Sequence, residues 1–362
     1  MRRVAALDGV RGIAIAAVVG LHAFNWPSNG ARGVDVFFVL SGFLITTLLL
    51  DEHATNGRVA FGAFYVRRAR RLLPALVITI AAYLAVSVAT AHRVGHAVVA
   101  SLVAGSYTTN LVASSGHASL AGALTHTWSL SAEEQFYLVW PVLLFLVFLG
   151  RRHAAIRLLA IVIAAVTVEQ SILAKSGATG WRLTSGPDTR SVGLAMGCLA
   201  ALCVPELARF PRSARRTASL AVALSALLAG LGLFVHRIEP YRLGGLTVFC
   251  GAVAVLIVRA AHGTSLTARV LSLAPLVWLG RISYSLYLYH LPIFLALGVL
   301  SGAAVTTKVF AIGLSLTAAA LSFRYVEQPF LRHGGRPVRA EEAATAARDV
   351  RVKGLEPAAA ER

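Results

Sequence analysis

Arg11 and His22 are the two residues of the first apolar segment whose side chains could bind an anion and move a proton. The segment reads LDGVRGIAIAAVVGLHAFNW from residue 7 to residue 26. Eleven residues of an ideal α-helix advance by three turns and about 20°, so both side chains lie on one face, roughly 16 Å apart along the axis. Asp8 falls within about 40° of the same line. Anchoring at the membrane surface would explain Asp8 and Arg11, but His22 lies a full turn inside Trp26 and is therefore a functional candidate.

Asp35 opens the second apolar segment, GVDVFFVLSGFLITTLLL, directly after the turn WPSNGARG. This position returns Asp35 to about the depth of His22. A carboxylate there can hold the ring N–H of a histidine and fix its tautomer. The alternative is an acidic residue at a helix N-terminus, which the helix dipole favours. Ser41 and Gly42 in the same segment are predicted to serve close helix packing.

The stretch FGAFYVRRARRLLPA carries four arginines in five positions. Arg68 and Arg71 are neighbours on a helix because they are three residues apart. Guanidinium groups match phosphates in bidentate geometry, so this pair is a candidate phosphate site. A topological signal or a contact with anionic lipid explains any single one of these arginines equally well.

The stretch THTWSLSAEEQFYLVWP combines carboxylates with aromatic side chains. Ser131 and Glu134 fit a capping box at the start of a helix, which would account for Glu134. Glu133 is not explained by the cap. Together with His126, Trp128 and Tyr137, it supplies the kind of group that grips a sugar or another hydroxyl compound.

The stretch LGRISYSLYLYHLPIF repeats polar aromatic residues at a spacing of three. Tyr284, Tyr287 and His290 therefore follow one helical face. An aromatic belt at the membrane interface is the alternative explanation.

Elements that position these residues follow from the composition. Of the 362 residues, 57% are hydrophobic and only 14% are charged, whereas a soluble domain has about 25% charged residues. Apolar runs this continuous predict helices in a bilayer, because the backbone polar groups must be paired internally. We predict an all-α polytopic membrane protein with ten spans, at residues 10–25, 34–50, 72–90, 135–150, 156–173, 190–205, 217–235, 243–259, 282–300 and 306–325.

The positive charge is predicted to mark the cytoplasmic side. With the N-terminus inside, the arginine clusters at 67–71, 151–157 and 209–216 all lie inside, as the positive-inside rule requires. Ten spans then return the C-terminus to the same side, and the net charge of +18 needs no nucleic acid to explain it. If residues 97–113 crossed the membrane, every later arginine cluster would lie on the outer side. We therefore assign these residues to an outer loop or a re-entrant helix.

Residues 1–331 are predicted to form one transmembrane domain, and residues 332–362 a charged cytosolic tail that is partly disordered. Cys198, Cys203 and Cys250 lie within apolar segments without the spacing of a metal site. We interpret them as core residues, and we expect no metal and no disulfide.

Six stretches in this order, over residues 7 to 330, together resemble the acyltransferase three family of integral-membrane O-acyltransferases. They are LDGVRGIA…LHA, GVDVFFVLSGFLI, FYVRRARRLLPA, HTWSLSAEEQFYLVWP, ISYSLYLYHLPI and VEQPF. The Arg-x10-His motif of the family falls on Arg11 and His22, and its Arg-x-x-Arg motif on Arg68 and Arg71. Its WSL-x-x-E position falls on Glu133.

This resemblance implies a ten-helix protein, located in the plasma membrane of a bacterium, that transfers an acyl group from cytosolic acyl-CoA to a hydroxyl, commonly on a carbohydrate. No cofactor would be bound permanently. The phosphates of CoA would contact Arg11, Arg68 and Arg71. The acceptor would contact a second group of residues: His126, Trp128, Glu133, Tyr137, Tyr287 and His290.

In the mechanism that we expect, His22, oriented by Asp35, deprotonates the acceptor hydroxyl as that oxygen attacks the thioester. The sequence has no GxSxG elbow, which favours direct transfer, although an acyl-histidine relay stays open. The acceptor could instead be a hydroxyl of a secondary metabolite such as a macrolide. A rival from another class is a transporter or flippase that uses the polar stripe of the first helix as a path.

Overall fold

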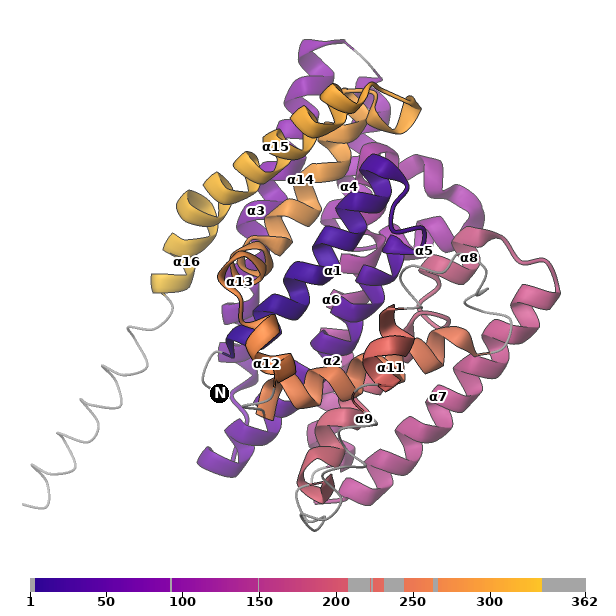
Figure 1. Cartoon of the computed structure of the whole chain (residues 1–362), viewed down its shortest axis with the longest axis vertical. Helices are drawn as coiled ribbons and strands as arrows, with labels where there is room; N and C mark the ends of the chain where they lie inside the picture. The colour runs from indigo at the N-terminus through magenta and orange to yellow at the C-terminus, as the bar shows by residue number, and fades with distance from the viewer. Residues whose placement is uncertain are drawn as a thin grey trace, which may run out of the picture.

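The first helix of the chain lies at the centre of a helical bundle. The computed structural model describes residues 4–91, 93–148, 150–207, 222, 224–230, 244–262 and 266–333. Within these ranges every regular element is a helix, as the predicted fold class requires. Helix α1 (Ala5–Phe24) contacts α2 (Gly33–Asn56), α13 (Ala274–Arg281) and α14 (Ser283–Ala296), and Figure 1 shows it between them.

Helices lie at nine of the ten predicted spans, and the few described residues of the seventh, 222 and 224–230, are helical as well. Besides α1, α2 and α14 they are α3 (Phe61–Ala89), α6 (Trp128–Leu143), α7 (Arg152–Lys175), α9 (Ser191–Leu207), α11 (Gly245–His262) and α15 (Val305–Ser322). The predicted span at 217–235, the arginine cluster at 209–216 and the tail beyond residue 333 fall largely or wholly outside the described residues.

Among the described residues, five helices are long and apolar enough to cross a membrane, or six if one bent pair counts as a span. The predicted count of ten spans and the cytoplasmic position of both termini therefore stay predictions. Helices α9 and α14 fall short because they have only 17 and 14 residues, whereas an upright crossing takes about 20. The five candidates are Ala5–Phe24, Gly30–Asn56, Phe61–Ala89, Arg152–Lys175 and Val305–Leu331.

The chain turns back sharply after its fourth helix, α4 (Val94–Gly105). This helix and the helical stretch from Thr109 onward meet at an angle of 117°. Such a bend fits the predicted re-entrant path of residues 97–113. Short elements complete the described chain: α5 (Thr109–Val112), η2 (Ala113–His117), η3 (Ala118–Thr127), η4 (Leu144–Phe148), α8 (Gly180–Ser185), α12 (Leu266–Leu271), η6 (Val299–Ser301), η7 (Phe323–Glu327) and α16 (Gln328–His333).

Glycines let the helices of the bundle touch backbone to backbone. A methyl group placed on Gly280 of α13 would collide with the backbone oxygen of Asp8 in α1. One placed on Gly42 of α2 would collide with the backbone oxygen of Leu194 in α9. The predicted packing role of Gly42 is confirmed. Small residues at helix contacts are typical of membrane bundles, where close van der Waals contact replaces the hydrophobic driving force.

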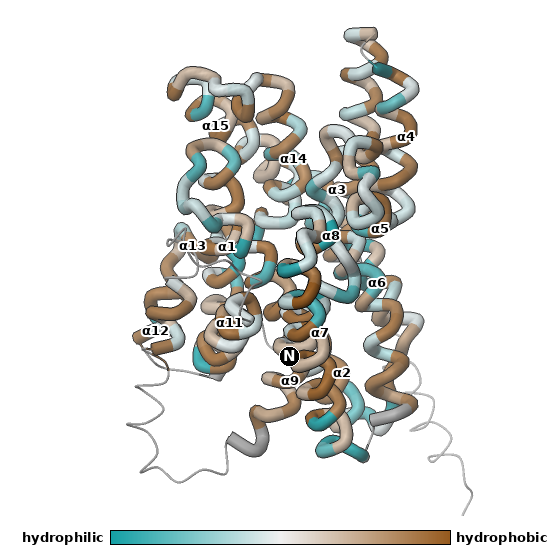
Figure 2. Tube along the Cα trace, turned by 90° about the vertical axis from the view of Figure 1, so that its right-hand side faces the viewer, coloured by the Kyte–Doolittle hydropathy of each residue, from teal (hydrophilic) through white to brown (hydrophobic). Residues whose placement is uncertain are grey.

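Apolar and polar side chains are segregated along the bundle. Cys198 and Cys250 are buried among apolar neighbours, and the three cysteines form no disulfide. Figure 2 shows hydrophilic positions midway along the molecule, around α1, α6 and α8, while α2 and α9 are mainly hydrophobic.

We expect Gly280→Ala to lower the free energy of unfolding, because the added methyl group forces α1 and α13 apart. Overpacking of this kind typically costs about 1–3 kcal/mol. The matched control is Gly313→Ala in α15, where a methyl group meets no atom within 4 Å and the higher helix propensity of alanine should stabilise the protein slightly. Thermal unfolding of both variants in detergent measures the difference. Equal midpoints would contradict the tight α1–α13 contact.

Candidate active site

Three cavities follow one another along α1. The inner cavity, about 360 Å³, is lined at its charged positions by Asp8, Arg11, Arg71, Arg281 and Glu327. The central cavity, about 90 Å³, has Arg11, Arg68, Arg71, Glu133 and Tyr137 in its wall. The outer cavity, about 600 Å³, has His22, Asp35, His126, Trp128 and Arg190 in its wall.

Neighbouring cavities share wall residues, so the three form one series. Arg11, Arg71, Ser283 and Tyr284 line both the inner and the central cavity. Val34 and Tyr287 line both the central and the outer cavity. The series therefore runs from the Asp8 end of α1 to its His22 end, with the smallest cavity in the middle.

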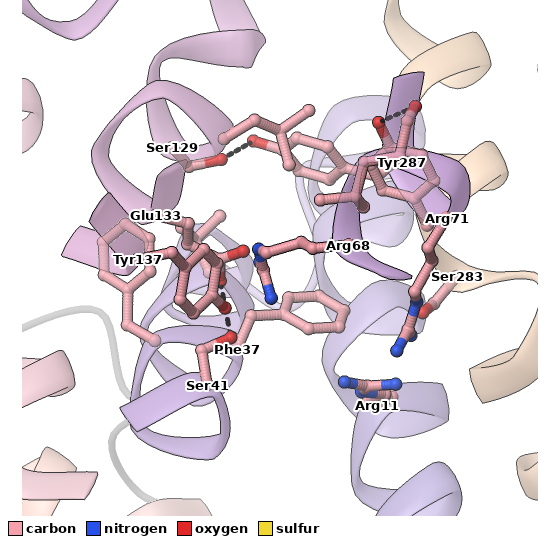
Figure 3. Close-up of a pocket in the computed structure, with 15 residues that line it drawn as sticks. Arg11, Phe37, Ser41, Arg68, Arg71, Ser129, Glu133, Tyr137, Ser283 and Tyr287 are labelled. Carbon is pink, nitrogen blue, oxygen red and sulfur yellow. Dashed lines mark hydrogen bonds between the residues drawn. The ribbon is translucent and has the colours of Figure 1, made fainter. Parts of the chain in front are cut away.

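The central cavity gathers most of the predicted binding residues. Helix α1 supplies Arg11, α3 supplies Arg68 and Arg71, and α6 supplies Glu133 and Tyr137. Figure 3 shows the guanidinium groups of Arg11 and Arg71 close together, with that of Arg68 turned toward Tyr137. Two neighbouring guanidinium groups repel each other, and an anion between them would relieve that repulsion.

The two members of the predicted Arg-x-x-Arg pair have different surroundings. Nε and Nη2 of Arg68 donate to Oε1 of Glu134 at 3.2 and 3.1 Å, and the guanidinium carbon lies 3.0 Å from the ring centre of Tyr137. Arg71, one helical turn further, is exposed in the inner and central cavities. A ligand can therefore reach Arg71 directly, while Arg68 is held in an ion pair.

The predicted capping box of α6 is wrong. Thr127 occupies the cap position without a side-chain cap bond, and the hydroxyl of Ser131 donates to the carbonyl of Thr127 at 3.1 Å. Glu134 faces α3 instead and balances the charge of Arg68. Glu133 accepts a hydrogen bond from Ser41 at 2.9 Å, so Ser41 has a polar role in addition to the predicted packing role.

The predicted pairing of Asp35 with His22 is also wrong. Oδ1 of Asp35 lies 2.7 Å from Nη2 of Arg190, and both side chains are at least 95% buried. The predicted depth of Asp35 along the helix axis agrees with the structure, because Asp35 and His22 line the same outer cavity. The rotation of α2 directs the carboxylate toward α9, where a buried arginine needs a counter-charge. The guanidinium carbon of Arg190 also lies 5.3 Å from the ring centre of Trp128.

His22 is bonded to a second histidine. Its Nδ1 lies 3.0 Å from Nε2 of His290, and the two rings are stacked with centres 5.1 Å apart. His290 is fully buried, so it lies behind His22 as its partner rather than on an open binding surface. The sequence predicted that His290 and Tyr287 share a helical face, but it did not predict this contact.

Helix α14 is hydrogen-bonded to His126 at two points, through the carbonyl of Leu288 and the hydroxyl of Tyr287. Pro292 has no N–H, so the carbonyl of Leu288, four residues earlier, lacks its usual helical donor. Nε2 of His126 lies 3.2 Å from that carbonyl oxygen. The hydroxyl of Tyr287 donates to the carbonyl of His126 at 2.7 Å and shares a hydrogen bond with Ser129, drawn in Figure 3.

The sequence analysis missed several wall residues of the outer cavity. Arg190 stands at the start of an apolar helix at the depth of Asp35, a signal that could have identified it. Trp181 of α8 had no such signal. Burial by itself would raise the pKa of Asp188, but hydrogen bonds from Arg182, Glu169 and the backbone of Thr189, together with the charge of Arg182, lower it to about 2. The Arg182–Asp188 ion pair holds α8 against the turn that leads into α9. In the described part of the chain, no cluster of histidine, cysteine and carboxylate side chains could hold a metal ion.

Three known proteins similar to this chain are O-acetyltransferases by name. The peptidoglycan O-acetyltransferase OatA of Listeria monocytogenes is 33% identical over 91% of this chain. The putative peptidoglycan O-acetyltransferase YrhL of Bacillus subtilis is 32% identical over 92%, and the O-acetyltransferase OatA of Staphylococcus aureus is 30% identical over 91%. The chain covers only 56–57% of the length of these three relatives.

No solved structure matches the chain. A family model does: the model described as Acyltransferase domain matches residues 4–325, almost the whole part of the chain that the structure describes. This match covers five of the six stretches on which the resemblance was based and ends one residue before the sixth, VEQPF. The chain belongs to the Acyltransferase domain family, acyltransferase family three.

Proposed function

We propose that this protein is a membrane O-acyltransferase that moves an acetyl or other short acyl group from cytosolic acyl-CoA to a hydroxyl of a carbohydrate. The observation that carries the proposal is the series of three cavities along α1, with accessible arginines at one end and His22 at the other. Relatives named peptidoglycan O-acetyltransferases support the reaction class and the kind of acceptor.

The donor would bind at the inner and central cavities. Arg11 and Arg71 offer two adjacent guanidinium groups, the arrangement that suits the pyrophosphate of CoA. Arg68, fixed by Glu134, would orient the donor and stabilise its charge from one side. The narrow central cavity suits an extended chain such as the pantetheine arm. The rise of roughly 16 Å from Arg11 to His22 fits the reach of that arm.

The acceptor would bind in the outer cavity, because that cavity contains the candidate base. Its wall combines two tryptophans, Trp128 and Trp181, with hydroxyl and amide side chains such as Thr184 and Asn29. Flat aromatic faces and neutral hydrogen-bonding groups suit a sugar ring, which has apolar C–H faces and polar edges. The donor and the acceptor would thus approach from opposite ends of α1.

In the proposed step, His22 takes the proton of the acceptor hydroxyl while that oxygen attacks the thioester carbonyl. The tetrahedral intermediate then expels the thiolate of CoA. The thiolate takes up the proton from His22, leaving an O-acyl ester and free CoA. An acyl-histidine relay would instead acylate His22 first, and a rapid-quench search for acylated protein distinguishes the two routes.

Purified protein in lipid nanodiscs tests the reaction class. Radiolabelled acetyl-CoA is supplied with oligosaccharides of N-acetylglucosamine as acceptor probes, and with a macrolide as the alternative acceptor. Label transferred to an acceptor supports the enzyme and identifies the acceptor class. Movement of a sugar across a proteoliposome membrane without acyl chemistry would support a transporter instead.

We expect His22→Ala to reduce acetyl transfer by at least about 100-fold, the lower end of what a general base contributes. Acetyl-CoA binding should stay within about twofold of wild type, since the phosphate ligands are intact. His153→Ala, an exposed histidine of α7 outside the three cavities, is the control. A His22→Ala protein with a tenth of wild-type turnover would rule out the general-base role.

We expect Arg71→Lys to weaken acetyl-CoA binding at least ~10-fold, or ~1.4 kcal/mol, because lysine keeps the charge but loses the bidentate fork. Binding of acetyl-pantetheine, which lacks the nucleotide, should change far less. Arg70→Lys is the matched control one residue away. Titration calorimetry measures donor binding by the wild type and the two variants. An equal loss of affinity for acetyl-CoA and for acetyl-pantetheine would contradict the phosphate contact and leave Arg71 as a topology signal.

A further inference from the structure

We propose that His290 is a positioning residue that fixes the tautomer and ring orientation of His22, with its own tautomer set by two backbone carbonyls of α14. The inference rests on the proposed role of His22 as the base. It assigns to a neutral histidine the task that a carboxylate performs in a Ser-His-Asp triad.

The hydrogen on the ring of His290 can be located from its partners. Nδ1 lies 2.8 Å from the carbonyl oxygen of Tyr287 and 3.1 Å from that of Leu286. A carbonyl oxygen only accepts hydrogen bonds, so Nδ1 must carry the hydrogen. Full burial disfavours a second, charging proton on the same ring. Nε2 of His290 is therefore an unprotonated acceptor.

The tautomer of His22 follows from this assignment. Its Nδ1 lies 3.0 Å from Nε2 of His290, and one of these two atoms must donate. Because Nε2 of His290 accepts, Nδ1 of His22 carries the hydrogen and donates it. Nε2 of His22 is then the nitrogen with the free lone pair, the atom that can take a proton from an acceptor in the outer cavity, whose wall contains His22.

The alternative orienting groups are engaged elsewhere. The carboxylate of Asp35 lines the same cavity but forms its ion pair with Arg190. His126, whose ring centre is 5.5 Å from that of His290, meets it edge to face and has Nε2 against the carbonyl of Leu288. His290 is thus the side chain that contacts Nδ1 of His22, and stacking of the two rings fixes the plane of His22.

The test begins with the wild-type chain in nanodiscs, labelled with ¹⁵N in its histidine rings. The ¹⁵N shifts of a neutral imidazole differ by tens of parts per million between protonated and unprotonated nitrogens. His22→Ala identifies the His22 signals by their disappearance. We expect Nδ1–H and a bare Nε2 for His22. The opposite tautomer in the wild-type protein would overturn the proposal without any positioning variant.

Two variants then separate an orienting role from a purely structural one. His290→Gln keeps an acceptor oxygen near the position of Nε2, whereas His290→Phe keeps the ring volume without an acceptor. We expect His290→Phe to lower kcat by at least about 100-fold, with acetyl-CoA binding within about twofold of wild type, and His290→Gln to recover about tenfold of that loss. Tyr289→Phe, one residue away on α14, is the control.

The failure of this inference is distinguishable from the failure of the proposed function. If His22→Ala abolishes transfer while His290→Phe retains wild-type kcat and the wild-type His22 tautomer, only the positioning role falls. If His22→Ala remains active, the proposed base is wrong whatever His290 does. Equal kcat for His290→Gln and His290→Phe at unchanged donor affinity would also count against the acceptor role of Nε2.

Discussion

A charged side chain inside an apolar bundle is stable only where an opposite charge or several hydrogen bonds meet it. This requirement joins the helices of the protein around its cavities. Arg190, directly before α9, meets Asp35 of α2, and Arg68 of α3 meets Glu134 of α6. Glu327 of η7 accepts a hydrogen bond from Ser285 of α14. Each contact ties two helices at a cavity wall, so the polar side chains that could do chemistry also determine which helices are neighbours.

Hydropathy was enough to locate the helices, because a backbone in lipid has few other ways to pair its polar groups. It was not enough to count the spans. The predicted span at 282–300 becomes a helix of only 14 residues, which ends where Gly298 adopts a left-handed conformation at φ 66°. The sharp turn after α4 likewise depends on packing against α3 and η3. Tertiary contacts of this kind leave no mark in a hydropathy profile.

The same division applies to the site. Helix periodicity predicted that Arg11 and His22 share a face of α1, and both line the cavity series, one at each end. Partners on other helices were not predictable, since the depth of a residue says nothing about the rotation of its helix. Asp35 at the expected depth therefore faces Arg190, while His22 meets His290, 268 residues away in the chain. The capping box failed for a related reason: a local motif was outweighed by the charge of Arg68 on α3.

The arrangement places opposite demands on one helix. On the proposed mechanism, its inner end must be polar enough to hold anionic phosphates, and its outer end must keep a base uncharged until a hydroxyl arrives. Separation along α1 meets both demands, because the Coulomb interaction between the arginines and His22 weakens with distance, which is roughly 16 Å along the helix axis. An insertion of one residue between Arg11 and His22 would turn the histidine by about 100° and remove it from His290. On the proposed mechanism, the spacing of ten residues is thus set by the length of the donor arm and by the rotation that brings His22 against α14.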